Sequence, residues 1–269
     1  MDLTSAKGLL KKEWILLRWG VLTVFLLNII VVMVAPPIIN RSFGLPLNAF
    51  GNSLVISGVW FVVSMFVAVG ILYASLESEM KQPDIWLHSP VPMWKLVGIK
   101  ALFAIAVTAM LLVLGGILLS ISYIMSDAYG TIPKVSGVLS MLSVMISIFL
   151  KAIYIMALVF MFWSLYQVWR TRSGQLSIIF TTLIIFAGIF TGTVISELLR
   201  ASKVLQAIKE FGPVKLTNVP FYNEQNSYFF TGVVLEGVVF TIGGLILYGG
   251  LTILYFAVGA KLFEKKVRL

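Results

Sequence analysis

Residues 54–76 read LVISGVWFVVSMFVAVGILYASL, an apolar run with no charged side chain. About 20 helical residues cross a hydrocarbon core of roughly 30 Å, whereas the strands of a membrane barrel alternate apolar and polar residues. Six mostly apolar runs, separated by short polar segments, lie at 19–39, 54–76, 97–124, 137–168, 175–197 and 233–260. The sequence therefore predicts an all-α polytopic membrane protein, in which six transmembrane helices form a single domain over 1–269.

The composition fits a protein that is surrounded by lipid. Of the 269 residues, 59% are hydrophobic and 12% are charged, which is about half the charged fraction of a soluble domain. The absence of cysteine excludes disulfides and thiolate metal sites. The net charge of +9 could indicate a nucleic-acid partner, but the basic residues lie mainly beside the apolar runs. We therefore expect the lipid bilayer as a partner and no nucleic acid.

The polar segments contain no catalytic motif. Phosphate-binding loops, dinucleotide-binding glycine motifs, zinc-protease motifs and serine-hydrolase elbows are all missing from the sequence. The single histidine, His88, cannot supply a metal cluster. We therefore expect that the chain is not an enzyme, binds no metal and has no cofactor of its own.

The distribution of basic residues predicts the orientation in the membrane. Six spans place both termini on one side, and thirteen lysines and arginines then lie on that side, against six on the other. Basic residues concentrate on the cytoplasmic side of membrane proteins. We therefore expect a multi-pass protein of the cell membrane with both termini in the cytoplasm.

The first segment, LTSAKGLLKKEWILLR at 3–18, has the pattern of an amphipathic helix that lies on the membrane surface. Its apolar stripe consists of Leu3, Ala6, Leu10, Trp14 and Leu17, with Lys12 opposite and Lys7, Lys11 and Arg18 at the flanks. The alternative is a basic flank of the first span. The residues expected to hold such a helix at the interface are Leu10, Lys11, Lys12, Trp14 and Arg18.

The segment around the loop between the second and third spans reads SLESEMKQPDIWLHSPVPMWKLVGIKALFA at 75–104. Acidic residues at the start of this segment mark the point where the chain leaves the membrane. Asp84 can cap a short apolar helix, which Pro90 and Pro92 would end. A short helix held between two spans can act as a lever on both; the alternative is a loop helix that lies on lipid. The candidate residues are Glu77, Glu79, Asp84, Ile85, Trp86 and Leu87.

The charged residues Lys151 and Glu236 are expected at membrane depth. Counting about 20 residues from the cytoplasmic boundary places Lys151 in the outer half of the membrane and Glu236 near the outer edge of the last span. These side chains could pair across the bundle, form an ion relay, or extend to the interface. The run 137–168 would be roughly 48 Å long as one helix, so it must tilt, break or protrude.

The order of these features resembles the permease subunit of type-2 ABC exporters. The resemblance rests on KKEW in the N-terminal segment, on SPVPMWKLVGIKAL after the short apolar element, and on a last span that runs into LFEKKVRL. It implies an elbow helix at 3–18, a cytoplasmic coupling loop at 78–95, and an extracellular loop with short helices at 198–232. A second coupling contact would lie near Arg170 and Arg172. Where the family more often has a leucine-rich stretch, this chain has WLHSPVP, which leaves the docking register open.

The resemblance also implies the partners. Two permeases, identical or related, would enclose the pathway, and separate cytoplasmic ATPases carrying ATP and magnesium would dock on Trp86 and Leu87, with Glu77 or Glu79 as polar anchors. The exported cargo would be hydrophobic, such as a lipid-like molecule, a peptide or a drug. One alternative is a stand-alone channel or ion-coupled transporter, which needs a relay of intramembrane charges. Another is an intramembrane enzyme, which needs clustered Asp, Glu or His at membrane depth.

Overall fold

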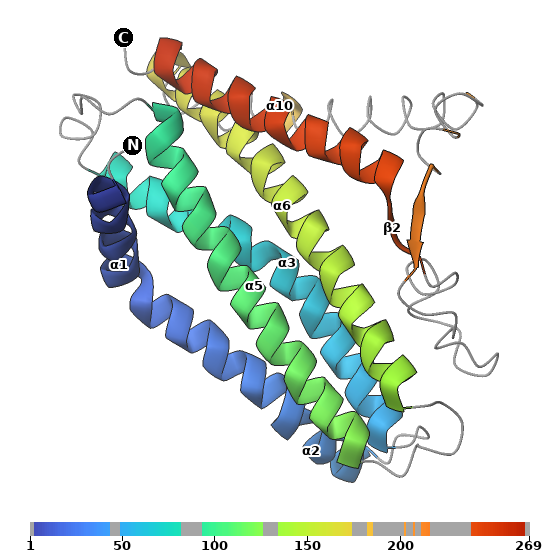
Figure 1. Ribbon diagram of the computed structural model, residues 1–269. Helices are drawn as coiled ribbons and strands as arrows, with labels where there is room; N and C mark the ends of the chain where they lie inside the picture. Colours follow the sequence, from blue (N-terminus) through green and yellow to red (C-terminus); the bar gives the residue numbers. More distant parts are fainter. Residues whose placement is uncertain are drawn as a thin grey trace.

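The computed structural model describes residues 3–43, 49–81, 93–125, 134–173, 182–184, 202, 207, 211–215 and 238–266. These residues form long helices and one small sheet (Figure 1). The helical elements are α1 (Leu3–Ile29), the π-helix η1 (Ile30–Val34), α2 (Ala35–Phe43), α3 (Ala49–Met80), α5 (Met93–Met125), α6 (Lys134–Ser173) and α10 (Ile242–Lys266). Two short strands, β1 (Pro213–Lys215) and β2 (Val238–Thr241), pair antiparallel.

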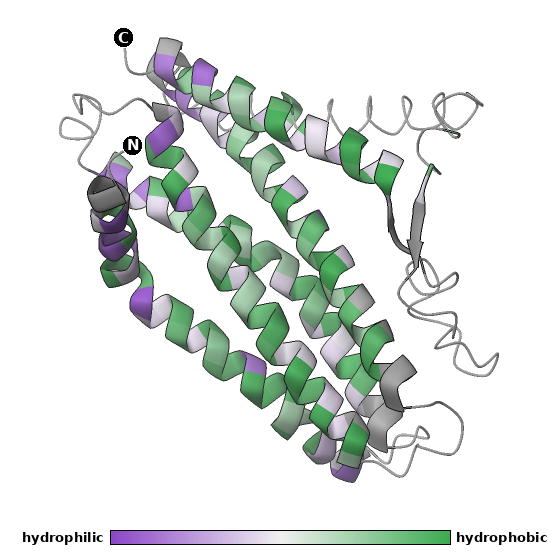
Figure 2. Ribbon diagram, viewed as in Figure 1, coloured by the Kyte–Doolittle hydropathy of each residue, from purple (hydrophilic) through white to green (hydrophobic). Residues whose placement is uncertain are grey.

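Five helical stretches within the described residues are long and apolar enough to cross a membrane. They are Lys7–Ser42, Ser53–Met80, Trp94–Ser122, Val144–Arg170 and Ile242–Glu264. Apolar residues cover most of the length of these helices (Figure 2). The prediction of a helical, multi-pass membrane protein is confirmed, whereas the predicted span at 175–197 lies outside the described residues except for 182–184.

The direction of the helices bears on the number of spans. α1, α3, α5 and α6 alternate in direction, whereas α6 and α10 run the same way and end where α1 begins (Figure 1). We call this end of the bundle the basal end and the opposite one the distal end. One further crossing between α6 and α10, such as the predicted span, would produce this arrangement. The count of six remains a prediction.

The N-terminal region is one continuous helical run through α1, η1 and α2. α1 bends part-way along its length (Figure 1), but no break separates the predicted interfacial helix 3–18 from the first span. The π-helix ends at Val34, and Ala35 separates it from Pro36 and Pro37. A proline lacks the N–H and clashes with the carbonyl four residues earlier, and the wider turn, in which Ala35 N–H donates to Ile30 O, accommodates both rings.

α6 is longer than a membrane span and is not broken. Its 40 residues, Lys134–Ser173, form a single uninterrupted α-helix, which is roughly 60 Å long. Because this exceeds a hydrocarbon core of roughly 30 Å, α6 must tilt or protrude from the membrane. A break, the third predicted possibility, does not occur.

The predicted start of the last span at residue 233 is wrong. β2 occupies Val238–Thr241 and α10 begins only at Ile242, where the hydroxyl of Thr241 accepts the N–H of Gly244 at 2.9 Å as an N-cap. The stretch VVFT is apolar and β-branched, and such a stretch fits a strand as well as a buried helix. Hydropathy alone therefore placed the helix boundary too early.

Buried apolar clusters hold the bundle together. The basal cluster joins α3, α5, α6 and α10 and includes Val97, Phe160 and Phe263. The distal cluster includes Val32 of η1 and Phe61 of α3. Since lipid is as apolar as these side chains, the clusters act through close packing rather than through exclusion of water. α1 has a smaller apolar contact with α5, so its attachment depends more on polar contacts.

Candidate functional site: a buried ionic network

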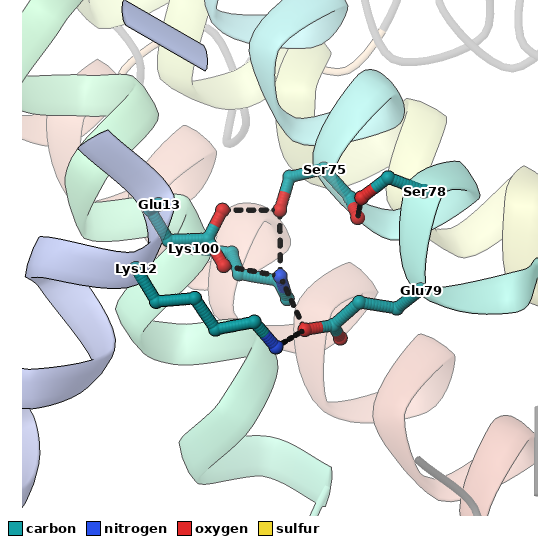
Figure 3. A network of polar contacts seen from close by, with 6 residues as sticks. All are labelled: Lys12, Glu13, Ser75, Ser78, Glu79 and Lys100. Atoms are coloured by element: carbon teal, nitrogen blue, oxygen red, sulfur yellow. Dashed lines mark hydrogen bonds and ion pairs between the residues drawn. The ribbon is translucent and has the colours of Figure 1, made fainter. Parts of the chain in front are cut away.

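Polar side chains from three helices meet at the basal end of the bundle (Figure 3). Glu13 comes from α1, Ser75 and Glu79 from the last turns of α3, and Lys100 from the second turn of α5. The side chains of Glu13 and Lys100 are each 3% exposed, and Ser75 is buried as well. The cluster lies where α1 crosses the two helices that flank residues 82–92.

Lys100 is the centre of the network. A lysine ammonium has three N–H donors, and each has an acceptor here: Glu13 Oε1 at 2.5 Å, Ser75 Oγ at 2.6 Å and Glu79 Oε1 at 3.1 Å. One acceptor belongs to α1 and the other two to α3. Lys100 therefore joins all three helices through a single charged group.

Ser75 and Glu13 complete this arrangement. The Ser75 hydroxyl accepts from Lys100 and donates to Glu13 Oε2 at 2.5 Å, so both carboxylate oxygens of Glu13 have a partner. Ser78, one turn further along α3, donates to the carbonyl of Ser75 at 2.7 Å. Glu13 thus connects α1 both to α3 and to α5.

Glu79 links the buried part of the network to its surface. Its Oε1 atom binds Lys100 and also Lys12, whose Nζ lies 2.8 Å away on a side chain that is 57% exposed. Within the part of the chain that the structure describes, the buried Oε2 atom of Glu79 has no hydrogen-bond partner. This oxygen is an acceptor site that the described contacts leave open.

The local sequence KKEW explains how α1 reaches two environments. Successive helical residues are turned by about 100°, so Lys11 and Trp14 are exposed, Glu13 is buried, and Lys12 lies between them and reaches Glu79. Leu9 and Leu17, one turn on either side of Glu13, pack against the apolar clusters. The buried face of α1 at this level is therefore Leu9, Glu13 and Leu17.

The charges of the network balance. Lys12 and Lys100 supply two positive charges, and Glu13 and Glu79 supply two negative ones. Taking a charge out of water costs several kcal/mol, and a partner with good geometry and full hydrogen bonding offsets this cost. Removal of one member leaves an uncompensated buried charge. The main effect of such a network is therefore to favour one arrangement of α1, α3 and α5 over others. Its contribution to net stability is small.

A second polar contact fastens α1 further toward the distal end. Asn28 is fully buried; it donates to the carbonyl of Leu111 on α5 at 2.9 Å and accepts the indole N–H of Trp60 on α3 at 2.8 Å. A Cβ at Gly115 would lie 2.6 Å from the Phe61 ring and 3.2 Å from the Asn28 oxygen, so this glycine makes room for both side chains. Together with the ionic network, Asn28 attaches α1 at two levels to the same two helices.

The sequence-predicted coupling residues are only partly described. Glu79 belongs to the network, Glu77 of the same helix is partly buried, and Arg170 is exposed at the basal end of α6. Arg172 lies in α6, but its side chain is outside the described residues, as are Asp84, Ile85, Trp86 and Leu87. The predicted contact of these residues with an ATPase remains a prediction.

The other predicted residues fall on exposed surfaces where they are described. The residues expected to hold the N-terminal helix at the interface are all exposed, namely Leu10, Lys11, Lys12, Trp14 and Arg18. Lys151 is an exposed residue of α6, and Glu236 lies outside the described residues. The proposed pairing of Lys151 with Glu236 therefore remains a prediction.

Sequence reasoning missed Glu13, Ser75 and Lys100. Two signals point to them: Glu13 is an isolated acid between lysines and tryptophan, and Lys100 lies within the predicted apolar run 97–124. A charge inside a span is costly and needs a partner. Their pairing could not be read from the sequence because they are 87 residues apart.

The described contacts of this site are ion pairs and hydrogen bonds that attach α1 to α3 and α5. Among the described residues, no group of three His, Cys, Asp or Glu side chains could hold a metal ion. In comparisons with known proteins, no family model, no curated protein and no solved structure matches this chain.

Proposed function

We propose that this chain is the membrane-spanning permease subunit of an ATP-binding cassette exporter, driven by separate ATPase subunits on its basal side. The observation that carries the proposal is the ionic network. It joins α1 to the last turns of α3 and the first turns of α5, the two helices between which the predicted coupling residues lie. A force on the segment between α3 and α5 would therefore act on α1, α3 and α5 together.

The mechanical argument depends on the rigidity of the connected elements. α3 and α5 are uninterrupted helices of 32 and 33 residues, and Asn28 attaches α1 to both of them at a second level. Two attachment levels prevent α1 from rotating independently. Movement of the basal ends of α3 and α5 would therefore carry α1 with them, as a two-state shift of the bundle requires.

In this proposal the chain forms the pathway and hydrolyses no ATP. Two permeases, identical or related, would enclose the path, and ATP and magnesium would be held by the partner ATPases. The long apolar helices favour a hydrophobic cargo, such as a lipid-like molecule, a peptide or a drug. ATP binding by the partners would act through differential contacts with two states of the bundle.

The test is capture of the partner from solubilised native membranes. The affinity-tagged chain is photolabelled with 8-azido-ATP in the presence of magnesium, and we expect the label on a copurified ATPase and not on this chain. Replacing Trp86 and Leu87 with aspartate should abolish capture of the labelled chain. Arg41→Asp, at an exposed position of α2, serves as the control. Capture that survives the double replacement would contradict the docking assignment.

One observation supports a second candidate, an ion-coupled transporter that works alone. Glu13, Glu79 and Lys100 are buried ionisable groups in contact, and such groups form proton relays in membranes. The purified chain in vesicles that contain a pH-sensitive dye distinguishes the two functions. A proton flux that depends on Glu13 and needs no partner would favour the transporter over the permease.

A further inference from the structure

The outward face of the first turns of α1 carries a row of basic residues. Lys7, Lys11 and Arg18 are all exposed, as is Trp14 between them. At about 100° per residue, these four side chains fall within an arc of about 60° on the helix. They form one stripe, which we call the basic stripe, turned away from the buried Glu13.

The basic stripe has no acidic neighbour on its own helical run. In residues 3–43 the single acidic side chain is Glu13, which is 3% exposed and bound to Lys100 and Ser75. Arg18 lies over the ring of Trp19, 5.4 Å from its centroid, and Trp19 is 71% exposed. The face therefore combines exposed positive charge with exposed indole rings.

The helical run is longer than the hydrocarbon core. The helical stretch Lys7–Ser42 comprises 36 residues, or roughly 54 Å of helix, against a core of roughly 30 Å. A helix of this length tilts or extends into the headgroup regions. Tryptophan and basic residues concentrate in these regions, and most of the hydrophilic residues of α1 lie toward its basal start (Figure 2).

We propose that the basic stripe binds anionic phospholipid headgroups of the basal leaflet and that this chain prefers such lipids to zwitterionic ones. The lysine and arginine side chains would contact lipid phosphates, and the indole rings of Trp14 and Trp19 would lie beside the glycerol region. Attraction of about 1 kcal/mol per basic residue near an anionic surface corresponds to roughly a fivefold gain in affinity for each residue. The proposal does not depend on a partner ATPase.

The stripe and the ionic network share one turn of α1. Lys11 belongs to the stripe, whereas Lys12 contacts Glu79 and Glu13 contacts Lys100. Binding of headgroups to the basic stripe would favour the rotation of α1 in which Lys12 and Glu13 face the ionic network. Adjacent lysines thus have separate roles, and this offers a matched pair of replacements.

The test measures quenching of tryptophan fluorescence by brominated lipids in vesicles. Brominated phosphatidylglycerol is compared with brominated phosphatidylcholine, for the wild type and for the combined Lys7→Gln, Lys11→Gln and Arg18→Gln replacements. A Trp14→Phe, Trp19→Phe version of each protein provides the background from the other tryptophans. We expect a preference of at least tenfold for phosphatidylglycerol in the wild type, which falls with added salt and is lost in the triple variant.

Two further proteins separate binding from folding. Lys12→Gln removes the same charge from the same turn but from the network side, so the lipid preference should be kept. The charge-retaining combination of Lys7→Arg, Lys11→Arg and Arg18→Lys should also keep it, even if the neutral triple variant does not fold. Equal quenching by both lipids in the wild type would overturn the proposal, as would an equal loss of preference in Lys12→Gln and the triple variant.

Discussion

Replacing Glu13 and Lys100 with methionine, singly and together, tests whether the ionic network is one unit. Methionine has a similar length and no charge, so each single variant removes one charge without leaving a large cavity. Glu13→Met leaves Glu79 as the carboxylate partner of both Lys12 and Lys100. Lys100→Met leaves Glu79 paired with Lys12 and removes the described ion-pair partner of Glu13. The double variant leaves Lys12 and Glu79, a balanced pair near the surface.

The magnitudes follow from the burial of these groups. Each single replacement should lower the free energy of unfolding by about 3 kcal/mol, because it leaves one buried charge of the network uncompensated. Independent effects would add to about 6 kcal/mol in the double variant. Since the double variant has no uncompensated buried charge, we expect a loss of no more than about 2 kcal/mol, and hence a coupling of at least about 4 kcal/mol.

The assay is reversible unfolding in mixed micelles, followed by tryptophan fluorescence as the fraction of denaturing detergent rises. The signature of the network is a double variant that is more stable than either single variant. Lys12→Met provides the comparison for an exposed member, with an expected loss of about 0–1 kcal/mol. A double variant that loses the sum of the two single effects, to within about 0.5 kcal/mol, would refute the reasoning.

Three other changes test the rest of the bundle. Asn28→Leu should destabilise the fold by about 1–3 kcal/mol because it leaves the Trp60 indole N–H unpaired in the interior, and a double-mutant cycle with Trp60→Phe should give a coupling of roughly 0.6–1.7 kcal/mol. Gly259→Ala should cost about 1–3 kcal/mol, because its Cβ would lie 2.9 Å from an aromatic carbon of α6. Gly250→Ala, with nothing within 4 Å of the added Cβ, should be neutral or stabilise α10 by up to about 1 kcal/mol. Thermal unfolding in one detergent compares them, and equal effects at the two glycines would show that α6 and α10 are not packed as described.

Much of the fold could be predicted from hydropathy. A run such as 54–76 is too long and too apolar for any soluble element, and its helix was expected correctly. The strand at Val238–Thr241 was missed because a short apolar β-branched stretch has no period that distinguishes strand from helix. The π-turn before Pro36 depends on local backbone geometry that no hydropathy pattern encodes.

The candidate site was less predictable than the fold. Glu13 is visible in the sequence as a lone acid beside two lysines, and Lys100 as a charge inside an apolar run. Their pairing depends on how α1 crosses α5. A rotation of α1 by about 100°, which is one residue of helix, would place Lys12 or Trp14 inside instead of Glu13. Contacts between Leu9, Leu17 and the apolar clusters select the rotation, and these are tertiary contacts.

The central claim is that nucleotide-driven movement at the basal end reaches α1 through the ionic network. Because the chain has no cysteine, spin labels can be attached at cysteines introduced at the exposed positions Ile15 of α1 and Lys261 of α10. Their distance is measured in the complex captured with its ATPase, without nucleotide and with ADP–vanadate. We predict a shift between the two conditions that is lost when Glu13 and Lys100 are both methionine. No shift in the wild-type complex, or the same shift in the double variant, would contradict the claim.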